Sequence, residues 1–368
     1  MLDLYKKSGI FKVVFTMRRI DRLGDKNQDI AACVRRLEKR RENIWSSCVE
    51  KYMFPNESLE ATVIVPVFNQ ERYISQCIDS LLRQKTLYSY EIIVVDDGST
   101  DGTREILETY NDSRLKIIHQ NNHGIAQARN QGLIAARGRY ILFCDSDDYM
   151  PEYALDRLLR IAIRTNADVV EGAYQYVNEN GAKGKTKRHL WFQNRYLDTY
   201  GVPWGKCIKR ALFNNVLFPP GYWFEDSVIH HIILPRAKKI VWIKSIVYYY
   251  RTNSGGVTSQ SRGNLASIDS LWITMSLAKD HSDLGLPVDN NYFAYLLRMA
   301  RVTYWRVNEL SSETRKLVFY IYKEFIIQLF NAQKGYIEIP LYKLDQRNIF
   351  AIFRDGTFQM YDEYFQKT

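Results

Sequence analysis

The sequence predicts an α/β protein built on a doubly wound, mainly parallel sheet, and three observations support this prediction. Between residues 62 and 163, short apolar runs rich in β-branched residues alternate with segments whose apolar residues recur at helical spacing. This alternation is typical of parallel strands joined by crossover helices. The run around Tyr140 is apolar almost throughout, as expected of a strand covered on both faces. Polar residues follow three of the runs, and parallel strands would bring them to one edge of the sheet.

The expected elements follow one another in chain order. The first strand covers residues 62–68, and Asn69 caps a helix that has apolar residues at positions 74, 78, 81 and 82. Further strands are expected at 91–95, 115–119, around 140 and at 168–177, and helices at 103–110, 124–137, 151–163 and 224–234. The helix at 124–137 is rich in Ala and Gly, which suits close packing on the sheet. Residues 178–188 are expected to form a polar, lysine-rich loop, which could meet an anionic acceptor or be the solvated tip of a hairpin.

Two flanking regions differ from this central domain, which we place at residues 58–258. Residues 1–57 form a basic helical extension, which could lie on an anionic membrane surface or pack on the protein. Residues 259–368 form a helical C-terminal region, because apolar residues such as Leu271, Phe293 and Phe325 recur there at helical spacing. Most of its aromatic residues are expected in a core, and the alternatives are a contact between copies of the chain or a patch resting on a membrane.

Composition limits the class of protein. With 368 residues and 46% hydrophobic content, the chain is long enough for one substantial domain with additions. The net charge of +10 suggests an anionic partner but does not choose among nucleic acid, lipid, polymer and nucleotide diphosphate. We expect no nucleic-acid partner, since no recognition motif is present. The five cysteines are widely spaced and no segment is long and apolar enough to span a bilayer, so we expect a cytoplasmic protein with reduced thiols, located in the cytosol or at the inner membrane face.

An acidic tip follows the run around Tyr140. Asp145, Asp147 and Asp148 fall within four residues, directly beyond the expected strand end. Ligands of open α/β sheets bind at such ends, and carboxylates are hard oxygen ligands for a divalent cation that can hold phosphates. The alternative is a solvated turn that caps the next helix.

A second polar tip covers residues 96–102. A carboxylate there could accept a hydrogen bond from the imide N–H of a uracil or from ribose hydroxyls. The alternative is a plain turn in which Ser99 or Asp101 caps the following helix.

Together, the segments 62–69, 94–103, 122–130 and 138–148 resemble the family-2 glycosyltransferases, which have the GT-A fold. The resemblance implies that Asp97, Pro66 and Val67 contact the nucleoside of a sugar donor. It also implies a D-x-D element in which Asp145 and Asp147 bind the metal, with Asp147 the more direct ligand. Further residues implied to bind the sugar donor are Asn69, Glu71, Gly98, Arg129, Asp145 and Ser146.

The resemblance extends beyond the acidic tip. Residues 203–210 are similar to a tryptophan-glycine-lysine segment beside the sugar pockets, which implies roles there for Trp204 and Lys206 together with Glu225. Asp226 corresponds to the family's general base, although both carboxylates could instead complement a helix dipole. The strand at 247–250 and the loop at 255–258 imply that Arg251 and Thr258 bind the diphosphate. Gly256 departs from the serine that many relatives have there.

These features predict an inverting, metal-dependent glycosyltransferase with a GT-A-like fold. The expected substrates are a UDP-sugar, with Mn²⁺ or Mg²⁺ as cofactor, and a hydroxyl of a saccharide, polymer or lipid-linked acceptor. Peripheral membrane contact and homo-oligomerisation through the C-terminal helices are further expectations. The alternative function is a catalytically silent GT-A module that binds a nucleotide sugar or scaffolds a partner enzyme.

Overall fold

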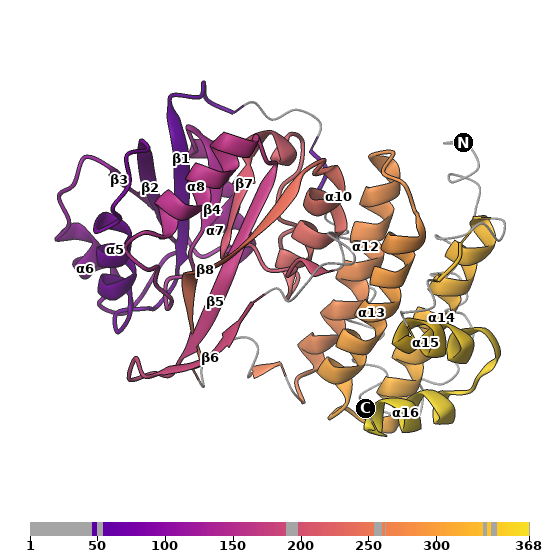
Figure 1. Ribbon diagram of the computed structural model, residues 1–368. Helices are drawn as coiled ribbons and strands as arrows, with labels where there is room; N and C mark the ends of the chain where they lie inside the picture. Colours follow the sequence, from indigo (N-terminus) through magenta and orange to yellow (C-terminus); the bar gives the residue numbers. More distant parts are fainter. Residues whose placement is uncertain are drawn as a thin grey trace. The chain divides into compact units, whose positions relative to one another are not determined.

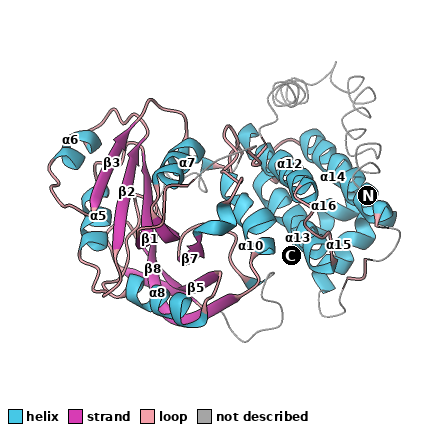
Figure 2. Cartoon of the chain, turned by 90° about the horizontal axis from the view of Figure 1, so that it is seen from above, coloured by secondary structure: helices cyan, strands magenta, loops and turns pink. Residues whose placement is uncertain are grey.

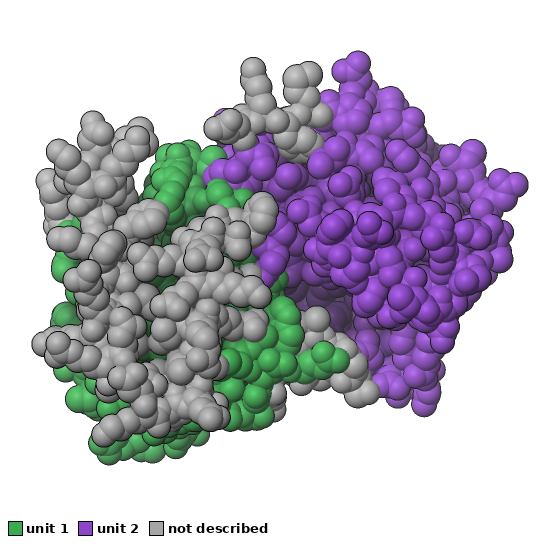
Figure 3. All heavy atoms as spheres, turned by 180° about the vertical axis from the view of Figure 1, so that it is seen from behind, with its two compact units in different colours: residues 1–46, 222–224, 255–368 green, residues 47–221, 225–254 purple. Residues whose placement is uncertain are grey.

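The computed structural model describes residues 46–49, 54–188, 198–253, 260–261, 263–333, 337–339 and 344–367. Most of the predicted N-terminal extension, and Thr258, lie outside the described residues. The chain divides into two compact units, coloured separately in Figure 3. One unit contains the sheet and is made of Ser47–Gly221 and Glu225–Ser254. The other unit contains Tyr222–Phe224 and the helices of the C-terminal region.

The sheet unit begins with four strands that alternate with helices, as expected (Figure 1). The bounds are β1 Leu59–Val67, α5 Ile74–Leu82, β2 Tyr90–Asp96, α6 Thr103–Glu108, β3 Leu115–His119, α7 Ile125–Ala135, β4 Gly138–Phe143 and α8 Ala154–Thr165. After these come β5 Val169–Val177, β6 Lys183–Lys187, β7 Lys206–Lys209, a short 3₁₀ turn at Arg210–Phe213, and β8 Ile240–Arg251.

These strands form one sheet in the order β3-β2-β1-β4-β7-β5-β6, with β8 pairing with β5. Strands β1 to β4 are mutually parallel, with Val67 beside Asp96 and Ile64 beside Phe143. Strand β7 runs antiparallel between β4 and β5, and β8 runs parallel to β5. The predicted mainly parallel sheet is confirmed.

Helices cover both faces of the sheet (Figure 2). Helices α5 and α8 pack on one face, where Val63 and Val65 of β1 share a core with Ile78 and Leu158. Helix α7 packs on the other face, where Ala128 contacts Ile93 and Val95. The Ala-rich and Gly-rich composition of α7 suits this close packing, as the sequence predicted.

One local prediction is wrong, and another is confirmed only in part. Residues 183–187 form strand β6 rather than a loop, and β6 pairs antiparallel with β5 at the edge of the sheet. Lysines are well suited to an edge strand because they discourage pairing with other chains, but they give no apolar signal in the sequence. The expected helix at 224–234 is helical from Glu225 but irregular, because a 3₁₀ turn at Glu225–Ser227 leads into a π-helical turn at Ile229–Ile233 and the short α10, Leu234–Arg236. Leu234 N bonds to the carbonyl five residues back, next to Pro235, which has no N–H to donate.

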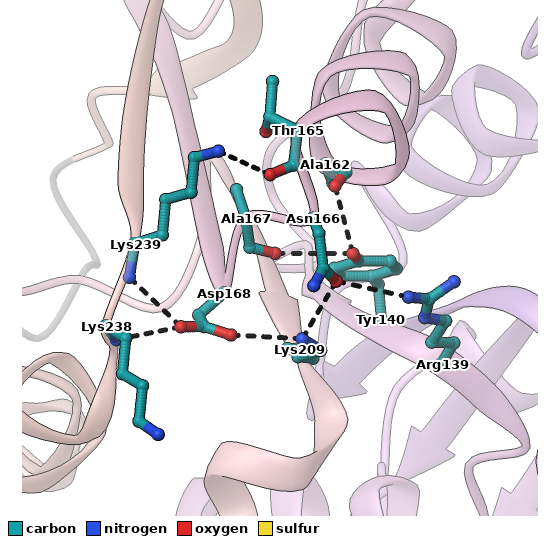
Figure 4. A network of polar contacts seen from close by, with 10 residues as sticks. All are labelled: Arg139, Tyr140, Ala162, Thr165, Asn166, Ala167, Asp168, Lys209, Lys238 and Lys239. Carbon is teal, nitrogen blue, oxygen red and sulfur yellow. Dashed lines mark hydrogen bonds and ion pairs between the residues drawn. The ribbon is translucent and has the colours of Figure 1, made fainter.

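A polar network anchors the start of β5 (Figure 4). The Asp168 carboxylate accepts hydrogen bonds from the backbone N–H groups of Lys238 and Lys239, at 2.8 and 3.1 Å, and from Lys209 Nζ at 3.2 Å. Lys209 belongs to β7, and Lys238 and Lys239 directly precede β8. One carboxylate therefore ties together three strands that are far apart in the sequence.

The helical unit confirms the predicted helical C-terminal region. Its helices are α12 Asp269–Asp283, α13 Asn290–Val307, α14 Ser312–Ala332, α15 Leu344–Asp355 and α16 Phe358–Lys367, preceded by a 3₁₀ turn at Leu265–Ile268. Many of its aromatic residues are buried, with Phe319 stacked on Phe353 and close to Tyr361. In the described part of the chain, no helix combines the length and apolarity needed to cross a membrane.

Candidate active site

The carboxyl ends of β1, β2 and β4 bring three polar loops to one edge of the sheet. The first two loops are fastened to each other by side chains that the sequence singled out. Asn69 Oδ1 accepts from Thr100 N at 2.8 Å, and Glu71 Oε2 accepts from Gly102 N at 2.7 Å. Asn69 and Glu71, predicted to bind the sugar donor, thus hold the second loop in place.

The buried carboxylate of Asp97 holds the second polar tip, residues 96–102, against the 120–124 segment. Its carboxylate accepts from Gln120 Nε2 at 2.6 Å, from His123 N at 2.8 Å and from Gly124 N at 2.7 Å, and it is only 3% exposed. Gly98 follows with a φ of 76°, and a Cβ there would lie 2.9 Å from Asn122 N. The backbone of this tip therefore approaches the 120–124 segment closely, which only glycine permits.

The acidic tip begins where β4 ends. Tyr248 of β8 fixes its start, because its hydroxyl accepts from Asp145 N at 3.0 Å, and a turn follows in which Asp148 N bonds to Asp145 O at 3.0 Å. The side chain of Asp145 is partly exposed, whereas Ser146 is buried. Burial and the nearby Asp145 raise the pKa of the Asp147 carboxyl to about 6. Burial also raises the pKa of Asp148.

Arg129 of α7 joins this acidic tip to the predicted base segment. Its guanidinium donates to Asp145 Oδ1 at 2.9 Å and to Glu225 Oε1, and the Arg129 side chain is only 4% exposed. Burial alone would lower the pKa of Arg129, but the charges of Asp145, Glu225 and Asp226 raise it. For Glu225, burial raises the carboxyl pKa and outweighs the opposing effect of Arg129.

Asp226 lies in the same charged neighbourhood. It is half-buried in the 3₁₀ turn of residues 225–227, and its charge acts on Arg129, on Glu225 and on Lys206. The structure therefore brings Asp145, Glu225 and Asp226 together, although 80 residues separate the two segments in the sequence.

Trp204 and Lys206 are both buried. The indole of Trp204 stacks on Tyr248 at 4.6 Å and on Tyr250 at 5.2 Å between ring centroids. Lys206 is fully enclosed, and its Nζ lies 2.5 Å from Glu171 Oε1 on the neighbouring strand β5. Burial lowers the pKa of Lys206, and Glu171 and Asp226 oppose that effect. Lys206 can therefore influence the site through its charge, but it has no surface to offer a sugar.

Asp145 and Asp147, the two residues of the predicted D-x-D element, suit a divalent cation. Both offer carboxylate oxygens, and burial together with the nearby charge of Asp145 raises the pKa of Asp147, so a cation would relieve the repulsion between the two carboxylates. Within the described ranges, no group of three or more His, Cys, Asp or Glu residues could hold a metal ion. Mg²⁺ is usually held by one or two carboxylates, with waters and substrate phosphates completing the shell.

Three polar residues at this site escaped the sequence analysis. Asn253 Nδ2 donates to Asp147 Oδ2 at 2.5 Å, Gln76 on α5 bonds to Arg251 at 2.5 Å, and Glu171 pairs with Lys206. Gln76 and Glu171 carry no local signal, because each acts through a partner far away in the chain. Asn253 lies two residues after Arg251, and this proximity was the one available hint.

Comparisons with known proteins show the family. Residues 62–222 match the family described as Glycosyl transferase family 2. Glycosyltransferase GlyG of Streptococcus pneumoniae is 34% identical over 219 residues, which cover 53% of this chain and 72% of GlyG. The Escherichia coli protein named UDP-Glc:alpha-D-GlcNAc-diphosphoundecaprenol beta-1,3-glucosyltransferase WfgD is 37% identical over 176 residues, 47% of this chain and 68% of WfgD.

A crystal structure of S. aureus TarS shares the fold. Its TM-score is 0.61 at 22% sequence identity, and the match covers 84% of this chain and 55% of the TarS chain. This chain thus spans just over half the length of TarS. On the family match and the identity to GlyG and WfgD, this chain is an enzyme that belongs to glycosyltransferase family 2.

Proposed function

We propose that this protein transfers a sugar from a UDP-sugar to a hydroxyl of a saccharide, polysaccharide or lipid-linked acceptor, with inversion at the anomeric carbon. The observation that supports this most is the position of Arg129, which bonds to Asp145 of the acidic tip and to Glu225, the neighbour of Asp226. Arg129 therefore links the tip proposed to hold the metal with the segment that carries the proposed base. The donor named for the relative WfgD, UDP-Glc, supports the choice of a UDP-sugar.

In this proposal the nucleoside binds beside the backbone of Pro66 and Val67 and near Asp97. Asp145 and Asp147 would hold Mg²⁺ or Mn²⁺, which when bound would neutralise charge on the departing diphosphate. Arg129 keeps the Asp145 carboxylate in a fixed orientation, so that no reorganisation is needed as the charge of the leaving group grows.

Asp226 is the proposed general base. A sugar hydroxyl is a weak nucleophile, and a carboxylate within hydrogen-bond reach can take its proton as the new bond forms. The acceptor oxygen then attacks the anomeric carbon from the face opposite the diphosphate, and this single displacement inverts the configuration. The buried Lys206 side chain lies close enough to interact electrostatically with Asp226.

Replacing Asp226 by Asn tests this assignment. We expect turnover to fall by roughly 10²- to 10⁴-fold, since general-base catalysis contributes about that much, while UDP binding is retained. The measurement is UDP released from a panel of UDP-sugars with Mn²⁺ and simple saccharide acceptors, together with calorimetric UDP binding. Asp283→Asn, at a surface ion pair on α12, is the control and should leave turnover unchanged.

Two results would contradict the proposal. A D226N variant with most of its activity would remove Asp226 as the base. A wild-type protein that binds UDP-sugars and Mn²⁺ but releases no UDP with any acceptor would favour the catalytically silent module.

A further inference from the structure

Arg251, which the resemblance assigns to the diphosphate, already uses its guanidinium within the protein. Its Nε donates to Asp147 O at 2.7 Å, its Nη1 to Glu179 O at 3.1 Å, and its Nη2 to Gln76 Oε1 at 2.5 Å. The whole residue is only 4% exposed. All three guanidinium nitrogens therefore have protein acceptors in a buried setting.

Aromatic rings and a backbone bond further hold Arg251 in this place. Its guanidinium carbon lies 4.5 Å from the centroid of the Tyr73 ring and 5.6 Å from that of Tyr149. Its backbone N–H donates to Asp148 Oδ1 at 2.6 Å. Such contacts favour a charged guanidinium at a buried position, and swinging it toward a ligand would break several of them at once.

The acceptors of Arg251 come from three separate elements around the site. Gln76 lies on α5, the helix that follows the first strand tip. Asp147 lies in the acidic tip, and Glu179 lies in the turn between β5 and β6. Arg251 itself ends β8. One side chain therefore connects helix α5, which follows the first strand tip, with the loop that carries the proposed metal ligands.

The Asp147 residue is held from two sides. Arg251 holds its backbone carbonyl, and Asn253 Nδ2 donates to its carboxylate at 2.5 Å. Mutating a group that orients a metal ligand typically lowers metal affinity by about 10- to 100-fold.

We infer that Arg251 is a positioning residue, whose hydrogen bonds connect the acidic tip to helix α5 and to the β5–β6 turn. It is not a ligand of the diphosphate. This inference rests on the function proposed above. Arg251 then contributes to UDP binding only through the orientation of Asp147, so its contribution depends on the metal. A phosphate ligand would instead contribute with or without metal.

The test measures calorimetric binding of uridine and UDP to the full chain, in EDTA and in Mn²⁺. Arg251→Lys keeps the positive charge, but one ammonium group can replace neither the paired guanidinium donors that a phosphate ligand would supply nor the set of bonds that Arg251 makes within the protein. We expect R251K to reduce the Mn²⁺-dependent gain in UDP affinity by about tenfold or more. The preference for UDP over uridine in EDTA should not change.

A second variant tests the inference without replacing a buried residue. Gln76 is exposed on α5, so Gln76→Ala should fold normally. Losing one hydrogen bond to a charged group should reduce the Mn²⁺-dependent gain by about fivefold or more. If Arg251 were a phosphate ligand, freeing it from Gln76 would leave UDP affinity equal or higher, so the two roles predict different directions. Gln131→Ala, at an exposed position on α7, is the matched control and should change nothing.

The outcomes separate this inference from the proposed function. A wild-type protein without UDP affinity, or without any gain from Mn²⁺, would contradict the proposed function and this inference with it. If R251K and Q76A both keep the wild-type gain in UDP affinity from Mn²⁺, the positioning role of Arg251 is contradicted and the proposed function is not. An R251K variant that loses its preference for UDP over uridine in EDTA would establish Arg251 as a phosphate ligand instead.

Discussion

Individual charged residues keep their places in this protein because several partners hold each of them. Arg114, which lies just before β3, is an example outside the site. It forms two bonds to the Asp112 carboxylate, at 2.8 and 3.0 Å, and a third of 2.5 Å to the hydroxyl of Tyr90. These bonds fix the turn before β3 against the start of β2. The Arg114 side chain and its backbone N–H lower the pKa of Asp112 to about 2.

Asp112→Asn should therefore destabilise the protein in a pH-dependent way. Because the folded-state pKa lies below the unfolded value, the ionised Asp112 stabilises the fold above about pH 4, and this contribution is lost as the pH falls toward 2. We expect a loss of less than about 1 kcal/mol at pH 7, since solvent screens the pair. Urea unfolding at pH 7, 5 and 3 measures the difference from wild type. A difference that is constant over this range would contradict the prediction.

At the scale of elements, the distance between helix α7 and strand β1 depends on one missing side chain. A Cβ on Gly132 would lie 2.4 Å from Cγ2 of Ile64. Real Cβ atoms do not approach that closely, so the glycine lets the helix pack directly on the sheet. Because α7 also carries Arg129, this packing sets how far the guanidinium reaches toward Asp145.

Gly132→Ala should lower stability by about 1–3 kcal/mol, the usual cost of overpacking a filled core. Ile64→Ala removes the methyl group that would clash, so the double variant should lose less than the sum of the two single variants. Thermal unfolding followed by circular dichroism measures each effect. Gly184→Ala in β6 is the control, because a Cβ there would meet its nearest neighbour at an ordinary 3.5 Å. Strict additivity would show that the clash with Ile64 is not what makes Gly132→Ala destabilising.

At the scale of the whole molecule, the chain leaves the sheet unit for three residues and returns to it. Tyr222–Phe224 belong to the helical unit, where Trp223 N donates to Asp269 Oδ2 at 3.0 Å. The guanidinium carbon of Arg306 lies 3.4 Å from the centroid of the Phe224 ring. Phe224 has a φ of 68°, an unfavourable conformation for a bulky residue that persists only when its surroundings hold it.

Arg306→Ala should release this segment. Removing the guanidinium exposes the Phe224 ring and takes away part of the support for its strained backbone. Chymotrypsin cleaves after aromatic residues, so we expect cleavage at residues 222–224 of the full chain to become severalfold faster, as the segment opens more often. Arg301→Ala on the same helix, which removes a cation paired with Asp345, is the control. An unchanged cleavage rate in R306A would show that Arg306 gives the segment no support.

The sequence by itself determined the mainly parallel sheet, the polar strand tips and the helical C-terminal region. These features can be predicted from local patterns. The spacing of apolar residues and the turn residues after each strand determine secondary structure within about ten positions. The motif order around Asp97, Asp145 and Asp226 likewise indicated the family, which the family match and the relatives then confirmed.

Only the tertiary structure decided how those residues are used. It inserted the four-residue strand β7 into the sheet, turned the lysine-rich segment into an edge strand, and paired Lys206 with Glu171. It also placed Arg129 between two acidic segments and enclosed Arg251 among Asp147, Gln76 and Glu179. The physical reason is that a buried charge takes its role from partners brought to it by folding, and those partners lie up to 175 residues away along the chain.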